Sequence, residues 1–401
     1  MRRYNINNIL VFVFLVFLHL PFPIAEVLHF QIRSGHLILL VFFYVFLVGF
    51  YFFVGVSFWE NSITQMVWLL RGMALLIFII TTPRFGITSS DLVSFLGTIG
   101  FTFFYEFGYF LTALVSEKNV FRYWSWAGTL SALVSLGLVV RVLLDTGIGG
   151  LIYGLDRIRL YIPAWPNYYA IQLMVLFWIA ITLGRIVSKR YVWVAVLAAA
   201  VLSLTLSRTA YLALGVTVFL ASLRRRFSPI VSLVLLTVIV LVAVGGAEFK
   251  ATSPGNILER TVSSRLARLR IGFEVWMDSP IVGNGLRPLT KTIPVYERNG
   301  MLRQMGSMHN DYMDLLVRGG LLYSLLFWTF VCVILWRGWR IKYGEWSWVS
   351  DLSYAIIGIL IAAVFQNPFK EPMSVSFFWL YAALVARVTV NRRHSYSVQH
   401  L

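Results

Sequence analysis

The sequence predicts an all-α polytopic membrane protein with about 12 transmembrane helices. The first observation is composition: the 401 residues are 59% hydrophobic and only 13% charged, whereas soluble domains carry about 25% charged residues. The second is the presence of long apolar runs, such as residues 37–56 and 231–244, which do not alternate as half-buried strands do. The third is the placement of basic residues in alternate loops. Helices are required because backbone groups in lipid must be satisfied within their own segment.

The first apolar run, residues 9–20, follows Arg2 and Arg3. The segment Pro23-Ile24-Ala25 faintly resembles a signal-peptidase site. Multi-span proteins commonly use their first helix as the anchor, so we interpret this run as an uncleaved span. The other spans are expected near residues 36–56, 63–82, 91–116, 123–145, 167–187, 191–206, 209–222, 229–247, 311–336, 349–366 and 373–390.

These spans divide the chain into three parts. Residues 1–247 hold transmembrane helices 1–9, including a short hairpin at 191–222. Residues 248–308 are polar and rich in arginine, and we expect them to form a loop subdomain outside the membrane. Residues 309–401 hold transmembrane helices 10–12 and a cytoplasmic tail.

The charges of the loops predict the orientation, because cytoplasmic loops collect lysine and arginine. One side receives Arg2, Arg3, Lys118, Arg122, Arg185, Lys189, Arg190, Arg224, Arg225, Arg226, Arg337, Arg340, Lys342, Arg387, Arg392 and Arg393. That side is the cytoplasm, and both termini lie there. The loop at 146–166, the Ser207-Arg208 turn, the loop at 248–308 and the turn at 366–372 then face outward. This topology explains much of the net charge of +17, so no nucleic-acid partner is expected.

The hairpin at 191–222 has 32 residues for two crossings, where about 40 are usual. A single span here would reverse everything after it and place the triple arginine at 224–226 outside, so the hairpin is favoured. Arg208 at its turn is therefore expected below the outer surface, at the bottom of a depression. A charge in that position is costly and indicates a functional site.

The loop subdomain contains a predicted amphipathic helix at 257–277. Its apolar stripe is formed by Val262, Leu266, Leu269, Phe273 and Trp276. Arg265 and Arg268 lie three residues apart on another face. One interpretation is an interfacial helix whose arginines meet the headgroups of membrane lipids. The other is an anion site, because guanidinium groups bind phosphate with bidentate geometry and keep their charge. The segment 279–285 is expected to end the helix and turn the chain back.

His309 lies where this loop becomes a span, and it is a candidate base of near-neutral pKa. A lone histidine is more often a structural hydrogen-bonding group than a catalyst. The setting favours catalysis, because Arg208 and Arg265 can reach the same cavity mouth. Asp311 and Asp314 are expected either to orient His309 or to cap the helix that follows. Asn310 and Tyr312 flank it and are candidate substrate contacts, together with Arg268.

Several further polar residues are informative. Arg71 and Glu106 fall at similar depths in neighbouring spans, and we predict a structural ion pair. Arg159 and Asn167 occupy the outer loop before the sixth span, where they line the same cavity or belong to the loop alone. Cys332 is the only cysteine, so no intrachain disulfide is expected. No metal or cofactor is expected, because no Asp-x-Asp pair, His-Glu-x-x-His motif or Walker loop occurs in the sequence.

Four segments resemble landmarks of one protein family. They are 206–213 (LSRTAYLA), 278–286 (DSPIVGNGL), 309–312 (HNDY) leading into Gly319-Gly320, and, more weakly, 166–170 (PNYYA). In order, spacing and sidedness they resemble the bacterial O-antigen ligases and O-antigen polymerases. The match covers roughly residues 160–320, and the hydropathy of the rest agrees.

The resemblance implies an inverting, metal-independent glycosyltransferase of the GT-C kind in the bacterial inner membrane, with its active site facing the periplasm. Such enzymes take a glycan from undecaprenyl pyrophosphate; ligases join it to the lipid A core, and polymerases join it to another lipid-linked repeat. By position, Arg208 and Arg265 would bind pyrophosphate, and His309 would activate the acceptor. A misalignment of one turn would exchange Arg265 with Arg260, Arg268 or Arg270.

Three functions stay open at this point. Ligation to the lipid A core is favoured slightly over polymerisation, and the sequence does not separate the two because donor and chemistry are shared. A lipid-linked glycan transporter is the rival from another class. Against it, the chain has no repeated halves and no spans broken at matching positions.

Overall fold

The computed structural model describes residues 6–19, 23–27, 30–33, 56–161, 166–205, 207–224, 257–289, 296–298, 301–303, 308–341 and 346–399. This part of the chain is helical apart from two antiparallel hairpins, β1 (Pro23–Val27) with β2 (Phe30–Arg33) and β3 (Tyr296–Arg298) with β4 (Met301–Arg303). Neither hairpin was predicted from the sequence. The span expected near 36–56, apart from its last residue, and the span expected near 229–247 lie outside the described residues.

The helices follow the order of the predicted spans. Their bounds are α1 Ile6–His19, α3 Val56–Trp59, α4 Ser62–Phe85, α5 Ser89–Thr102, α6 Phe104–Leu114, α7 Glu117–Tyr161, α8 Pro166–Ile186, α9 Tyr191–Leu204, α10 Arg208–Leu223, α12 Ile257–Met277, α14 Asp311–Trp339, α15 Val349–Ala363 and α16 Pro372–Gln399. A short 3₁₀ turn, η1 Pro368–Lys370, precedes α16. In the described part, five helices are long and apolar enough to cross a membrane, and α9, α10 and α15 are shorter apolar helices. The protein is thus a polytopic, mainly α-helical membrane protein.

Two helices depart from the predicted spans. The segment expected to cross at 91–116 is divided at Phe103, where α5 ends and α6 begins. The prediction of an outer loop at 146–166 is wrong for most of these residues, because α7 continues to Tyr161. This segment contains several glycines, yet Ile148, Ile152 and Leu155 keep the three- and four-residue spacing of a helix.

The centre of the bundle is formed by α8 and by residues 373–390 of α16, where most side chains are buried. α8 packs against α9, α15 and α7, and α16 packs against α6. Small residues permit this close packing, which is how helices associate in lipid. At Gly108 of α6, for example, an added Cβ would lie 3.0 Å from the backbone of Leu380 in α16.

The ion pair predicted between Arg71 and Glu106 is confirmed. Two nitrogens of Arg71 each lie 2.5 Å from a carboxylate oxygen of Glu106, and its Nε donates to Thr102 Oγ1 at 2.7 Å. The guanidinium also lies 3.9 Å from the ring centre of Phe103. Both charged side chains are buried, so each requires the other.

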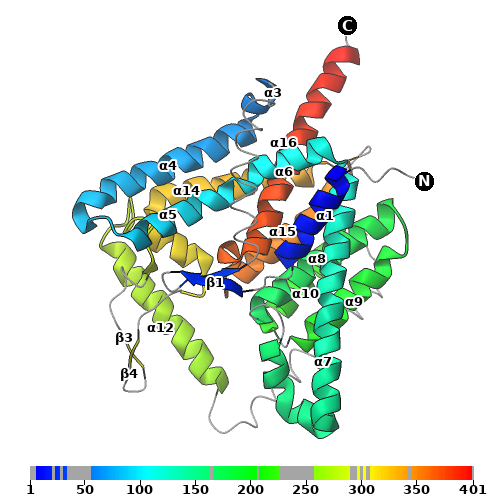
Figure 1. The fold of residues 1–401 in the computed structure, drawn as a ribbon. Coiled ribbons are helices and arrows are strands. Elements are labelled where there is room, and N and C mark those ends of the chain that lie inside the picture. Colours follow the sequence, from blue (N-terminus) through cyan, green and yellow to red (C-terminus); the bar gives the residue numbers. More distant parts are fainter. Residues whose placement is uncertain are drawn as a thin grey trace.

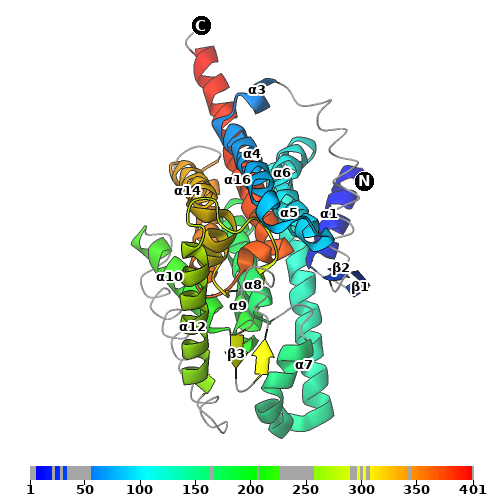
Figure 2. The same cartoon turned by 90° about the vertical axis from the view of Figure 1, so that its left-hand side faces the viewer.

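α12 stands apart from the central helices. In Figures 1 and 2 it extends toward the end of the molecule opposite the C-terminal end of α16, as the later part of α7 also does. Its bounds match the helix predicted at 257–277. The chain then turns at 278–285, as predicted, and returns to α14.

The returning turn docks at a kink in α14. Gly320 has φ 62° and ψ −169°, so the helix is interrupted there, and the amides of Leu321 and Leu322 donate to the carbonyls of Pro280 and Ile281 at 2.8 and 3.1 Å. Gly283, at φ 67°, faces Gly320 so closely that a Cβ on either residue would overlap the other's backbone. Two of the sequence landmarks therefore form one backbone junction.

Candidate functional site

Arg208 opens α10, directly after the turn that ends α9. The two helices form the short hairpin that the sequence predicted, with α9 ending at Leu204. Its turn is held by Tyr211, whose hydroxyl donates to the carbonyl of Ser203 at 2.5 Å. Arg208 itself is partly buried. A positive charge at a helix N-terminus interacts unfavourably with the helix dipole, so placing Arg208 there has an electrostatic cost.

Arg265 and Arg268 occupy the inward face of α12, and both are partly buried. Burial lowers the pKa of Arg265, and the guanidinium groups of Arg268 and Arg208 lower it further. Arg265 also lies 6.0 Å from the ring centre of Phe365, beyond α15. Three arginines from two elements therefore act on one another, a crowding of positive charge that an anion would relieve.

Arg270, on the same helix, has a different environment. Its side chain is 83% exposed and donates to Glu274 at 3.0 Å, one turn further along α12. The sequence left open which arginine of this helix accompanies Arg208. Among the described side chains of α12, the exposure of Arg270 leaves Arg265 and Arg268 as the candidates. Arg260 lies in α12, and its side chain is outside the described part of the structure.

His309 lies at the start of α14, partly buried and with a positive φ of 53°. Burial lowers its pKa from 6.5 to about 4, and the positive charges of Arg268, Arg265 and Lys370 contribute, while the carboxylate of Asp314 opposes them. The imidazole is therefore neutral at pH 7 and able to accept a proton. His309 and the arginines of α12 are brought together, as the sequence predicted.

Asn310 and Tyr312 connect this segment to the end of α15. The Asn310 side chain accepts from the amide of Met313 at 2.9 Å, which caps α14, and its Nδ2 donates to the carbonyl of Val364 at 2.9 Å. The Tyr312 hydroxyl donates to the carbonyl of Leu360 at 3.1 Å, and its ring stacks on Trp328. Both residues therefore satisfy carbonyls that the end of α15 leaves without helical partners.

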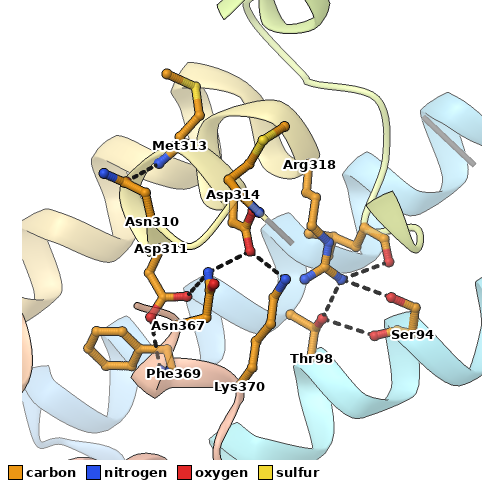
Figure 3. A network of polar contacts seen from close by, with 12 residues as sticks. Ser94, Thr98, Asn310, Asp311, Met313, Asp314, Arg318, Asn367, Phe369 and Lys370 are labelled. Atoms are coloured by element: carbon orange, nitrogen blue, oxygen red, sulfur yellow. Dashed lines mark hydrogen bonds and ion pairs between the residues drawn. The ribbon is translucent and has the colours of Figure 1, made fainter. Parts of the chain in front are cut away.

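Asp311 and Asp314 do not cap α14, since Asn310 has that role. Asp311 accepts from Asn367 Nδ2 at 2.9 Å and from the amide of Phe369 at 2.9 Å. Asp314 accepts from Asn367 Nδ2 at 2.7 Å and forms an ion pair with Lys370. Figure 3 shows these side chains converging from α14 and from the turn before α16. The sequence analysis did not identify Asn367 and Lys370 as site residues. The only sign of their role was that the turn at 366–372 was predicted on the same side as the other candidates.

A second network joins α5 to the segment after α12. Arg318 donates to Ser94 Oγ at 2.9 Å, to Thr98 Oγ1 at 3.0 Å and to the carbonyl of Arg287 at 3.0 Å. Arg287 is buried, with one nitrogen 3.7 Å from a carboxylate oxygen of Asp91. These two arginines fix the scaffold on which α12 and α14 meet.

Asn167 and Arg159 were the remaining candidates. Asn167 is partly buried in the first turn of α8, and the neighbouring Tyr168 hydroxyl bonds to the backbone of Asn367. The start of α8 therefore reaches the network shown in Figure 3. Arg159 belongs to α7, but its side chain is outside the described part of the structure.

The site combines a neutral base with fixed positive charges. Among the described residues, no three histidine, cysteine, aspartate or glutamate side chains gather as metal ligands would. The groups present suit binding of a phosphate or pyrophosphate, with a neutral imidazole at its edge.

The comparison with family models identifies the part of the chain that holds these residues. Residues 193–328 match the model described as O-antigen ligase, a stretch from α9 to the second half of α14 that contains Arg208, Arg265, Arg268 and His309. A comparison with curated proteins gave no match. Over these residues the chain is similar to the O-antigen ligases, and the resemblance inferred from the sequence to the family of O-antigen ligases and polymerases is confirmed there.

Proposed function

We propose that this protein is an inverting, metal-independent glycosyltransferase that moves a glycan from undecaprenyl pyrophosphate to an acceptor hydroxyl. The lipid A core is the favoured acceptor, as in an O-antigen ligase. The observation that carries the proposal is a chain of charges within the segment that matches the O-antigen ligase model: Arg265 and Arg268 act on a neutral His309, and Arg208 acts on Arg265. Fixed cations stabilise the charge of a departing pyrophosphate, and a neutral imidazole takes a proton.

In the proposed reaction, the acceptor oxygen attacks the anomeric carbon from the face opposite the pyrophosphate. The bond between that carbon and the pyrophosphate oxygen breaks, so the configuration inverts. His309 takes the hydroxyl proton, while Arg208 and Arg265 hold the released undecaprenyl pyrophosphate. No other reactant is required.

The low pKa of His309 is compatible with this role. With no donor bound, two arginines and a lysine disfavour the imidazolium. A bound pyrophosphate offsets their charge, so we expect the pKa of His309 to rise toward neutrality when the donor is in place. His309 is then most effective as a base when the donor is bound.

The finer assignments are part of the same proposal. Arg268, Arg159, Asn167, Asn310 and Tyr312 line the path of the substrate. The topology is that of a GT-C enzyme of about 12 spans in the bacterial inner membrane, with both termini cytoplasmic and the site facing the periplasm. Three elements support this arrangement because they lie at their predicted places in the chain: α12, the α9–α10 hairpin and the turn that precedes α16.

The decisive experiment measures transfer by purified enzyme in nanodiscs, with undecaprenyl-pyrophosphate glycan as donor and lipid A core as acceptor. We expect His309→Ala, Arg208→Ala and Arg265→Ala each to lower the rate by at least about a hundredfold. Arg270→Ala is the matched control and should retain normal transfer, because its side chain is exposed on the same helix. Near-normal transfer by the first three variants would remove the proposed site.

Polymerisation is the alternative within the same chemistry, and a gene deletion examined by lipopolysaccharide gel separates the two. Loss of a ligase leaves bare core while lipid-linked polymer accumulates. Loss of a polymerase leaves core that carries one repeat. Glycan movement into liposomes without a covalent product would favour the transporter instead.

A further inference from the structure

His309 is held between two fixed points of the backbone. On one side, the amide of Met308 donates to Asp314 Oδ1 at 3.0 Å. On the other, the Asn310 side chain caps α14 and is tied to Val364. Between them, His309 has the left-handed φ of 53°, a conformation that costs a residue with a side chain about 1–3 kcal/mol unless its surroundings hold it.

Asp314 is anchored in turn by the 3₁₀ turn before α16. Its Oδ2 accepts from Asn367 and pairs with Lys370, while Asp311 accepts from the same Asn367 and from the amide of Phe369. In Figure 3, Asn367 lies between Asp311 and Asp314, and Lys370 reaches Asp314 beside it. The segment before α16 is thus fastened to the first turn of α14.

An ordinary helix start does not require this arrangement. Asn310 already caps α14, and the bond from Met308 lies outside the helix. The Asp314 carboxylate is only 4% exposed, and burying it has a desolvation cost that the amide of Met308, Asn367 and Lys370 must offset. Lys370 is 35% exposed and also acts electrostatically on His309. The feature that this network fixes, apart from the helix itself, is the position of His309.

We propose that Asp314 and Lys370 are positioning residues that hold His309 through the backbone amide of Met308. This inference deepens the proposed function and rests on it. Lys370 orients the Asp314 carboxylate through their ion pair, Asp314 fixes the amide of Met308, and the imidazole is thereby directed toward the arginines of α12. A displacement of about 1 Å at a reacting group lowers a rate on the order of a hundredfold.

The test is a double-mutant cycle in nanodiscs with the lipid-linked donor. In the wild-type background, we expect Lys370→Met to lower kcat about ten- to a hundredfold with little change in the KM for donor. In the His309→Ala background, the same change should alter the residual rate less than about twofold, because the base that it positions is gone. Lys370→Arg should restore most of kcat.

The controls separate positioning from folding. Lys189→Met, in an exposed turn between α8 and α9, should leave both backgrounds unchanged. Asp314→Asn should behave as Lys370→Met does; should it fail to fold, the partly exposed Lys370 still completes the cycle. Thermal unfolding of each variant shows whether the bundle is intact.

The outcomes are distinguishable. Equal losses from Lys370→Met in both backgrounds, or a raised KM for donor with kcat unchanged, would overturn the positioning role while leaving the proposed function standing. Normal transfer by His309→Ala alone would overturn the proposed function, and this inference with it. A loss confined to kcat and absent without His309 would support both.

Discussion

The pKa of His309 provides the sharpest quantitative prediction. Its value of about 4, against an ordinary 6.5, corresponds to roughly 3 kcal/mol of free energy against the imidazolium. Burial is the largest cause of this lowered pKa, and Arg268 has the largest effect of any charged group. Replacing Arg268 by Gln removes that charge and keeps the burial. We therefore expect the pKa of His309 to rise by about half a unit to one unit and to stay below 6.5.

The measurement is NMR titration of the histidine ring resonances in nanodiscs, with His309→Gln to assign the signal. Arg270→Gln is the control and should leave the midpoint unchanged, since its exposed side chain bonds Glu274. Addition of inorganic pyrophosphate should raise the wild-type pKa, and should do so less in Arg268→Gln. A wild-type midpoint near 6.5, or an equal shift from the two arginine variants, would refute the electrostatic account of the site.

The same pKa makes a prediction about stability. The unfolded state binds the proton at an ordinary pKa of 6.5, above the folded value of about 4. The unfolded state therefore holds more protons between those values, and the contribution of His309 to the free energy of unfolding falls as pH is lowered from 6.5 to 4. Above pH 6.5 the contribution is constant. His309→Gln should reduce this acid sensitivity in thermal unfolding.

Other predictions concern the scaffold. Arg71→Leu should lower the free energy of unfolding by about 3–5 kcal/mol by leaving Glu106 buried and unpaired, and Arg71→Leu with Glu106→Leu should recover most of it; equal losses in the single and double variants would contradict this. Gly320→Ala should cost about 2 kcal/mol or more and lower transfer, because φ is positive and the docked turn leaves no space. Gly137→Ala, with nothing within 4 Å, should be tolerated, and thermal unfolding compares the two. Asn310→Ala should cost about 1 kcal/mol through the lost cap, and an unchanged melting temperature would argue against it.

Local periodicity predicted much of the fold. The helix at 257–277, the short hairpin around Arg208 and the turn at 279–285 follow from spacing and from turn residues. The pair of Arg71 and Glu106 was predictable because neither charge tolerates lipid alone. Each of these features depends on neighbours in sequence or on depth in the membrane.

Contacts between distant segments were not predictable in the same way. Asp311 and Asp314 suggested a local cap, but their partners lie more than fifty residues later, at Asn367 and Lys370. The kink at Gly320 depends on the docking of Gly283, which no local pattern of α14 indicates. The candidate site residues were proposed from the sequence because arginine and histidine are rare in an apolar chain, and their roles stay a prediction.

The junction of Gly283 with Gly320 has a mechanical consequence. The turn after α12 is joined to the kink of α14 by backbone hydrogen bonds. We therefore expect α12, which carries Arg265, and α14, which follows His309, to move as one unit. Arg208 belongs to a separate element, the α9–α10 hairpin. If the proposed function holds, we expect a lipid-linked donor to enter between these joined helices and the α9–α10 hairpin, with His309 and Arg265 moving together and Arg208 staying with the hairpin.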